Sequence, residues 1–184
     1  MRVDIISAMR VRSIASGILL LTVASCRPAA SPAETGRVAV GQQAPAFNLP
    51  RVDGKGRVGV PDGKVMLVAF WALEWGGQHE LPKLEDLHRR FADRGLEVVV
   101  VSHDMEGVYL PQVVQRYGIT FAMVWDDCQK IIKRWRPDNI MSVYLLDRDG
   151  VVRLVRSAGK ESSPCAAPGV ESAIEELLGP PGAP

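Results

Sequence analysis

The chain has 184 residues, enough for one domain of ordinary size with flanking segments. Hydrophobic residues make up 47% and charged residues 23%, which excludes a disordered polyelectrolyte and a bundle of membrane-spanning helices. The formal net charge is +1, so there is no electrostatic case for binding nucleic acid, which needs a concentrated basic stripe.

The N-terminus has the pattern of an export signal. Three arginines within residues 1–12 precede a short apolar stretch at 13–25, and Cys26 follows at once. The stretch is shorter than the about 20 apolar residues of a spanning helix, so residues 1–25 are expected to be a signal peptide. Val-Ala-Ser-Cys at 23–26 resembles the bacterial lipobox, whose cysteine becomes lipidated. The alternative is an ordinary signal peptide followed by an incidental cysteine.

Composition also sets the boundaries of the folded domain. Residues 26–39 are expected to hold the lipidated cysteine and a flexible tether rich in Pro, Ala and Ser. Residues 179–184 (Gly-Pro-Pro-Gly-Ala-Pro) suit neither helix nor strand and are expected to be a flexible tail. The domain then covers 40–178. From Cys26 onward the net charge is −1, so charge alone names no partner.

Apolar periodicity predicts the elements of this domain in chain order. Uninterrupted apolar runs at 65–72 and 96–102 predict strands buried on both faces. Helical spacing predicts helices over 82–92, 108–117, 129–135 and 170–178, and shorter strands are predicted at 121–125, 142–147 and 151–156. This alternation predicts a parallel sheet with helices on both faces, extended at one side by an antiparallel hairpin.

Four stretches carry a family resemblance. They are Gly-x-x-Ala-Pro-x-Phe-x-Leu at 41–49, the Asp-Gly-Lys and Gly-Lys turns at 53–55 and 63–64, Phe-Trp-Ala at 70–72 followed by Glu-Leu-Pro at 80–82, and Leu-Leu-Asp-Arg-Asp-Gly at 145–150. In this order they resemble thioredoxin-fold proteins of the redoxin group, most of all the exported TlpA-like thiol–disulfide reductases. The resemblance implies a thioredoxin-like three-layer α/β sandwich, with a central mixed sheet and helices on both faces.

The chain departs from that family at the reductase site. The family's strand leads into Trp-Cys-x-Pro-Cys at a helix N-terminus, where a thiol loses its proton easily. Here the loop at 73–79 is one residue shorter. Aligned from the strand, Trp75 and Gln78 take the cysteine positions; aligned from the helix, Glu74 and Gly77 take them. Neither register supplies the sulfur that a mixed disulfide or a peroxidatic thiol requires. The remodelled loop comprises Glu74, Trp75, Gly76, Gly77, Gln78 and His79.

The proline that faces the dithiol in that family is also replaced. Counting back from the strand at 142–147, its position is Met141. A cis bond before a residue other than proline costs about 2.5–4 kcal/mol, so we expect a trans bond and a different loop.

Two cysteines remain in the predicted domain, Cys128 and Cys165. They are too far apart in sequence for a C-x-x-C motif or a metal-ligand pair. Three interpretations stay open: two inert thiols, a structural disulfide favoured by an exported compartment, or a catalytic redox pair at a new place.

Other polar residues follow the predicted strands. Glu74, His79, His103 and Asp104 could converge at the carboxyl edge of the sheet, where open α/β sheets bind ligands. A metal or acid–base site would need such groups, but their spacing matches no ligand motif, and solvated loop residues are the simpler interpretation. We therefore expect no cofactor and no resident metal.

Two further surfaces are candidates for contacts. Trp75, beside two glycines, is a possible exposed aromatic platform for a partner. The run at 130–136 is basic and amphipathic, which indicates a solvated helix face or, as a lesser alternative, contact with a membrane surface.

Together these features predict an exported, membrane-anchored lipoprotein on the periplasmic side of the bacterial cell envelope. We expect it to bind a protein or peptide partner and to lack dithiol activity. The alternative is a thiol–disulfide oxidoreductase or antioxidant protein that works through Cys128 and Cys165. A weaker alternative is a metal or small-ligand site on Glu74, His79 and His103.

Overall fold

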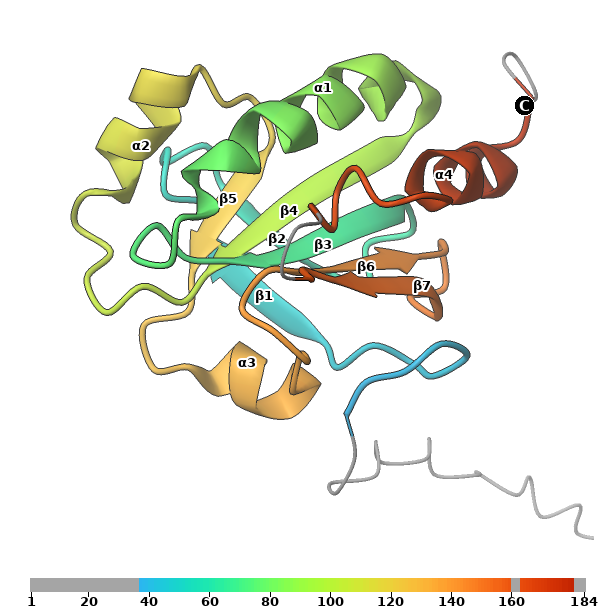
Figure 1. Ribbon diagram of the computed structural model, residues 1–184, viewed down its shortest axis with the longest axis horizontal. Helices are drawn as coiled ribbons and strands as arrows, with labels where there is room; N and C mark the ends of the chain where they lie inside the picture. Colours follow the sequence, from blue (N-terminus) through green and yellow to red (C-terminus); the bar gives the residue numbers. More distant parts are fainter. Residues whose placement is uncertain (1–36, 160–162, 181–184) are drawn as a thin grey trace, which may run out of the picture. The chain divides into compact units, whose positions relative to one another are not determined.

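The computed structural model describes residues 37–159 and 163–180 (Figure 1). The expected signal peptide, the lipidation site Cys26, most of the tether and residues 181–184 lie outside the described residues. Contacts divide the chain into residues 1–30 and 31–184, and the description concerns the second unit. Within the described ranges, the structure holds no helix with the length and apolar character of a membrane span.

A five-stranded mixed sheet forms the centre of the domain (Figure 1). Its order is β5-β4-β3-β6-β7; β3, β4 and β5 run parallel, and β6 is antiparallel to both of its neighbours. The strands are β3 (Val65–Trp71), β4 (Leu96–Ser102), β5 (Ala122–Trp125), β6 (Ser142–Leu146) and β7 (Val152–Ser157). This is the mixed sheet of the predicted thioredoxin-like fold.

Helices cover both faces of the sheet and complete three layers (Figure 1). One face packs against α1 (Leu81–Phe91), α2 (Leu110–Tyr117) and α4 (Val170–Leu178). The other packs against α3 (Lys130–Trp135) and a separate hairpin of β1 (Phe47–Pro50) and β2 (Arg57–Val60). Two short 3-10 turns, η1 (Gly77–His79) and η2 (Ala92–Arg94), flank α1.

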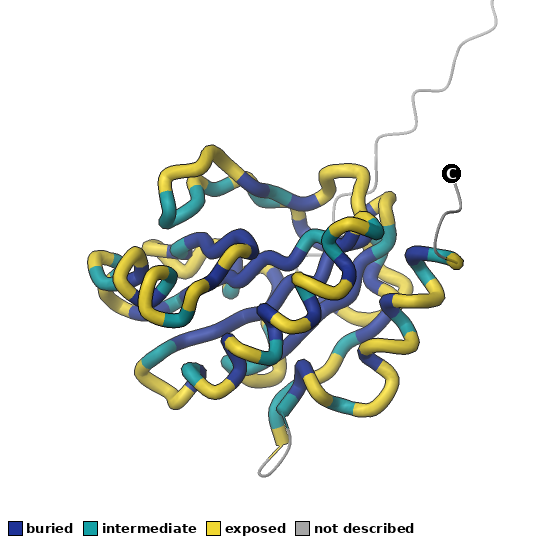
Figure 2. The backbone as a smooth tube through the Cα atoms, turned by 90° about the horizontal axis from the view of Figure 1, so that it is seen from above, coloured by how far each residue is buried: buried dark blue, intermediate teal, exposed yellow. Residues whose placement is uncertain are grey.

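The division of the core between the two faces of the sheet follows from the two-residue period of an extended chain. All seven residues of β3 are buried, and alternate ones point to opposite sides, so Leu67 and Trp71 join the core under α1 while Met66 and Phe70 join the core above α3. Figure 2 shows the buried strands running through the interior with exposed helix surfaces outside. The uninterrupted apolar runs are therefore a consequence of burial from both sides.

Trp135 organises the core on the α3 side. Its ring packs edge-on against Phe70 at 5.4 Å and Tyr144 at 5.1 Å between ring centroids, and its indole N–H donates to the Pro45 carbonyl at 3.0 Å. Burial raises the pKa of Tyr144 to about 12. Both cores draw their residues from Val38 to Leu178, so the chain from Arg27 onward contains a complete folding unit.

Two helices begin later than the periodicity predicts, each for a local reason. Pro111 lies in the first turn of α2, where a missing N–H costs nothing, and the helix starts at Leu110. The buried carboxylate of Asp126 accepts hydrogen bonds from the Ile131 and Ile132 amides at 2.9 and 3.0 Å, so α3 starts at Lys130.

Candidate functional site

The candidate site is the edge of the sheet at which β3 and β4 end. Because these strands are parallel, the loops at 72–80 and 103–109 leave the same edge, and Figure 1 shows them beside each other. β6 runs the opposite way, with Ser142 opposite Phe70, so Met141 also lies here. Ligands of open α/β sheets bind outside the carboxyl ends of strands, which makes this edge the place to look.

Asp104 fastens the two loops to each other. One carboxylate oxygen, Oδ1, accepts hydrogen bonds from the amides of Leu73 at 2.9 Å and Glu74 at 3.3 Å. The other, Oδ2, accepts the Ser102 hydroxyl at 2.7 Å. Asp104 is only 3% exposed, so it serves the backbone of the loop and is not an open ligand position.

We expect Asp104→Ala to lower the free energy of unfolding by about 2–3 kcal/mol, since it leaves the Leu73 and Glu74 amides without their acceptor. Urea unfolding gives this value, and faster amide exchange at Leu73 locates the effect. Asp127→Ala, which removes a nearby exposed carboxylate, is the control and is expected to change stability by less than about 0.5 kcal/mol. Equal stability of the two variants would contradict this role for Asp104.

Gly77 leaves no space for a side chain at one position of this loop. A Cβ atom at this position would lie 2.4 Å from the Trp71 indole nitrogen and 2.5 Å from the Ala72 carbonyl oxygen. Trp71 is fully buried and the second atom belongs to the backbone, so neither moves aside easily. The preceding Gly76 adopts a positive φ of 80°. The shortened loop therefore follows a path that excludes a cysteine at Gly77, one of the four positions that the two alignments give.

Apolar side chains are exposed at the same edge. Trp75 is 69% exposed on the first loop, and Met105 and Val108 are 81% and 77% exposed on the second. Of the four large hydrophobic residues exposed among the described residues, three lie here; the fourth is Val40. We call Trp75, Met105 and Val108 the apolar edge.

An apolar hollow of about 360 Å³ adjoins the second loop. Gly107 belongs to that loop and lines the hollow beside the Trp125 ring. Its remaining lining comes from the β1–β2 hairpin, from α2 and from the loop after β5, namely Leu49, Pro50, Arg51, Val52, Pro111 and Asp127. Because Gly107 lies between Met105 and Val108 in the sequence, the hollow borders the second loop of the apolar edge, and its volume is sufficient for a side chain of a partner.

A buried carboxylate lies beneath the first loop. Glu80 immediately precedes α1 and accepts hydrogen bonds from Lys83 Nζ at 2.9 Å, from the Ser163 hydroxyl and from the Cys165 thiol. Burial by itself raises the pKa of Glu80, but the hydrogen bonds from Ser163, Lys83 and Cys165 outweigh it, and the pKa is below its ordinary value. Glu80 is therefore ionised at neutral pH.

The low pKa of Glu80 gives an acid-dependent stability. The folded protein holds this proton less tightly than the unfolded chain, so the stabilisation is present above the ordinary glutamate pKa of about 4.3 and is lost as the pH falls through the folded-state value. We expect Glu80→Gln to show a smaller loss of stability between pH 7 and pH 3 than the native protein, measured by urea midpoints. Glu74→Gln, at an exposed carboxylate, is expected to keep the native pH dependence; identical curves for both variants would contradict the prediction.

The structure does not support the predicted cysteine pair. Cys165 is 4% exposed in the core under α1 and α4, whereas Cys128 is exposed and precedes α3 on the opposite face of the sheet. Both are free thiols, so the structural disulfide is wrong. Burial, and next the Glu80 carboxylate, raise the pKa of Cys165 well above its ordinary value, which leaves a protonated thiol where a nucleophile was expected.

Among the described residues, Glu74, His79 and His103 do not form the group of ligands that the weaker alternative of a metal site requires. His79 is exposed with its Nε2 3.5 Å from the Gln78 amide nitrogen, and His103 is half-buried after β4. Over residues 37–159 and 163–180, no three His, Cys, Asp or Glu side chains come together in a way that could hold a metal ion. Glu74, His79 and His103 lie at the same edge of the sheet but do not form one site.

Met141, which takes the position of the family's proline, lies at the carboxyl edge of the sheet, beside the end of β3. Met141 is half-buried against the core under α1, and its carbonyl accepts the Ala158 amide at 2.7 Å. Among the described residues the one cis peptide bond precedes Pro61, so the bond before Met141 is trans.

Sequence reasoning missed two features of this edge. The helix predicted over 108–117 includes Val108, whereas α2 starts at Leu110 and leaves Val108 in the loop; Pro111 is the signal for the later start. No pattern in the sequence predicts a role for Met105. The contact of Glu80 with Ser163 and Cys165 joins segments about 80 residues apart, which no local pattern reveals.

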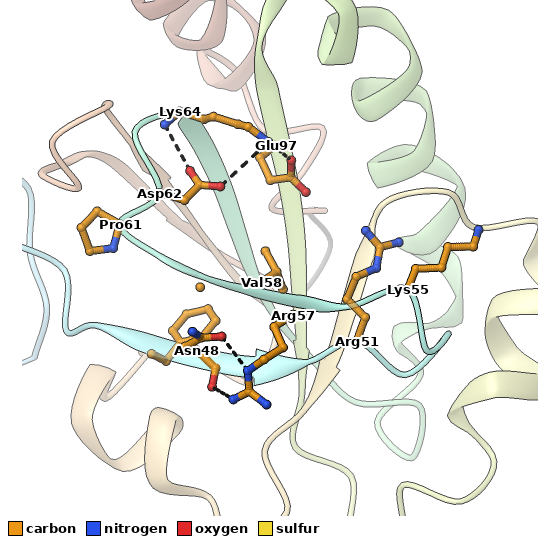
Figure 3. Close-up of a pocket in the computed structure, with 11 residues that line it drawn as sticks. Asn48, Arg51, Lys55, Arg57, Val58, Pro61, Asp62, Lys64 and Glu97 are labelled. Carbon is orange, nitrogen blue, oxygen red and sulfur yellow. Dashed lines mark hydrogen bonds and ion pairs between the residues drawn. The ribbon is translucent and has the colours of Figure 1, made fainter.

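A polar hollow of about 420 Å³ lies at the opposite, amino-terminal edge of the sheet (Figure 3). Its cations already have protein partners: Lys64 contacts Glu97 at 2.9 Å, Arg57 contacts the Asn48 side chain at 3.0 Å, and Arg51 and Lys55 contact Asp53. We assign no ligand to it.

The mixed sheet, its covering helices and the loop at the end of β3 define a thioredoxin-like α/β protein. Solved structures agree in fold. The thioredoxin domain of a thiol-disulfide oxidoreductase from Bacteroides vulgatus has a TM-score of 0.63 at 21% identity, covering 77% of this chain and 99% of that chain. A thiol:disulfide interchange protein from Bacteroides sp. has a TM-score of 0.61 at 20% identity, covering 79% and 94%.

Sequence comparison gives the family. The pattern of the AhpC/TSA family matches residues 40–155, more than half of the chain, and the chain belongs to that family. The thiol-disulfide oxidoreductase ResA of Bacillus thuringiensis is 27% identical over 124 residues, 65% of this chain and 70% of that protein. A chloroplastic peroxiredoxin Q of Suaeda salsa is 30% identical over 129 residues, 65% of this chain and 60% of that protein.

Proposed function

We propose that this redoxin-family chain is an exported lipoprotein that binds a protein or peptide partner at its apolar edge and does no dithiol chemistry. One observation carries the proposal: Trp75, Met105 and Val108 are exposed together at the carboxyl edge of the sheet, on loops that hold no cysteine. The export signal and the Val-Ala-Ser-Cys run at 23–26 support the lipid anchor and the periplasmic side.

The loss of dithiol chemistry has a geometric reason. Thiol–disulfide exchange begins with an accessible thiolate. Gly77 leaves no room for a side chain, and Cys165, the nearest thiol to this loop, is buried and protonated. Cys128 is exposed but has no second thiol beside it within the described residues. We therefore expect this chain to share the fold of the relatives named as thiol-disulfide oxidoreductases but not their reaction.

The apolar edge has the properties of a binding surface. Tryptophan is enriched among residues that dominate binding energies, because a large rigid ring buries much apolar area at little entropic cost. The Asp104 carboxylate accepts hydrogen bonds from the Leu73 and Glu74 amides, so the backbone immediately before Trp75 is held in place. A partner with apolar side chains would cover Trp75 and reach the hollow beside Gly107.

The test begins in cells that export the chain. A photoreactive benzoylphenylalanine replaces Trp75, and in a matched strain it replaces Arg148, which is exposed on the β6–β7 turn. We expect one protein to crosslink from position 75 and not from 148. With that protein purified, Trp75→Ala is expected to weaken binding at least tenfold, about 1.4 kcal/mol. Equal crosslinking from both positions, or unchanged affinity, would refute the assignment of the surface.

Redox activity and anchoring are tested separately. In a disulfide-reduction assay with an external reductant, we expect the native chain and Cys128→Ser to be equally inactive. Activity that disappears in Cys128→Ser or Cys165→Ser would restore the oxidoreductase alternative. Cys26→Ser is expected to abolish metabolic labelling with palmitate and to release the protein from the membrane fraction.

A further inference from the structure

The outward face of α3 consists of cations. Ile131 and Trp135, four residues apart, point into the core. The opposite face carries Lys130, Lys133 and Arg134, which are three and four residues apart and therefore lie together, and Arg136 follows at the helix end. All four are exposed. We call Lys130, Lys133, Arg134 and Arg136 the basic face.

These charges are not neutralised by the fold. Within the part of the chain that the structure describes, none of the four forms an ion pair with a carboxylate, although ten ion pairs occur elsewhere in it. Arg134 donates to a backbone carbonyl, that of Ala46, at 2.8 Å. From Cys26 onward the chain has a net charge of −1, so four cations without a carboxylate partner within the seven residues 130–136 are a local concentration that the overall charge conceals.

The basic face lies where the domain meets its N-terminal segment. The Val38 amide donates to the Trp135 carbonyl at 3.1 Å, and Arg37 forms an ion pair with Asp138, just beyond α3. Figure 1 shows this segment and α3 on the same side of the sheet. Only eleven peptide links separate Cys26 from Arg37. Even fully extended they span about 40 Å, so a lipid on Cys26 would hold Arg37, and the end of α3 that contacts this segment, within about that distance of the bilayer.

We propose that the basic face contacts the anionic phospholipid headgroups of the membrane that holds the anchor. This inference rests on the lipid anchor of the proposed function and adds a second, electrostatic contact to it. Ammonium and guanidinium groups attract lipid phosphates, and the attraction acts within the Debye length of about 8 Å at physiological salt. A short tether raises the local concentration of headgroups, so a weak contact is sufficient. The apolar edge is on the loops after β3 and β4, whereas the basic face is on the outside of α3, so the two contacts use different residues.

The contact is tested on the chain from Arg27 onward, which contains both cores and has no lipid. Vesicles of phosphatidylglycerol and phosphatidylcholine in equal parts are compared with vesicles of phosphatidylcholine alone by co-sedimentation. We expect binding to the anionic vesicles only, weaker at high salt. The double variant Lys130→Gln, Lys133→Gln is expected to bind about thirty-fold less tightly, from about 1 kcal/mol per charge and 1.4 kcal/mol per tenfold.

The matched control removes two charges elsewhere. Arg116→Gln, Arg148→Gln alters exposed cations on α2 and on the β6–β7 turn, with the same change in total charge. It is expected to change the affinity less than threefold. No binding of the native chain to anionic vesicles, or equal losses in both double variants, would overturn the proposal. Because this chain carries no lipid, that result is independent of whether Cys26 is lipidated, which palmitate labelling decides.

Discussion

Trp135→Ala is expected to lower the free energy of unfolding by about 3–5 kcal/mol, the usual range for removing a fully buried tryptophan. The Trp135 ring packs against both Phe70 and Tyr144, and its indole N–H donates a hydrogen bond to the Pro45 carbonyl. Its loss therefore leaves a cavity between α3 and the sheet and detaches the segment that precedes β1. Urea unfolding followed by circular dichroism measures the change.

Trp75→Ala is the matched control for that variant. It removes the same side chain from an exposed position, so stability is expected to change by less than about 0.5 kcal/mol. The two tryptophans then separate stability from binding: Trp135→Ala unfolds more easily, and Trp75→Ala folds normally but loses its partner. A Trp75→Ala variant that is as unstable as Trp135→Ala would mean that the apolar edge is part of the core.

Gly77→Ala is expected to destabilise the protein by about 1–3 kcal/mol, the cost of forcing extra atoms into a packed site. The added methyl would have to displace the Trp71 ring or the Ala72 carbonyl, both of which are buried. A change in tryptophan fluorescence is expected with it, because Trp71 moves. Urea midpoints and emission spectra measure the two effects.

Gln78→Ala is the control at the neighbouring, half-buried position and is expected to be close to neutral. Gly77→Cys extends the test to function, since it places a thiol in one of the family's two positions. We expect it to be destabilised like Gly77→Ala and inactive in disulfide reduction. A stable and active Gly77→Cys would show that the loop differs from the family only by substitution and not by its path.

This chain keeps the scaffold of the redoxin family, and in the proposed function its carboxyl edge binds a partner instead of carrying out dithiol chemistry. The apolar edge and the basic face are separate surfaces, one at the strand ends and one on the outside of α3. An anchored domain that rests on the bilayer through α3 would present Trp75 to partners beside it. The crosslinking and vesicle experiments test these two contacts independently.

The sequence by itself determined the fold class, the order of its elements and the absence of sulfur from the loop at 73–79. Strands such as β3 and β4 could be predicted because burial on both faces requires an uninterrupted apolar run, which is a local property. The strand boundaries of β4 and the limits of α4 agree with the periodicity to the residue. The start of α2 was predicted two residues early, because periodicity does not register the preference of Pro111 for a first turn.

Only the tertiary structure decided how distant groups meet. The expected export favoured a bridge between Cys128 and Cys165. The structure shows both as free thiols, one buried under α1 and α4 and the other exposed before α3, and this separation depends on how the chain crosses from α3 to α4. Position 77 requires glycine because of where the Trp71 side chain lies. Met105 is exposed because no other element among the described residues packs over it. Local sequence determines elements through backbone and burial preferences, whereas contacts between loops are set by the packing of the whole sheet.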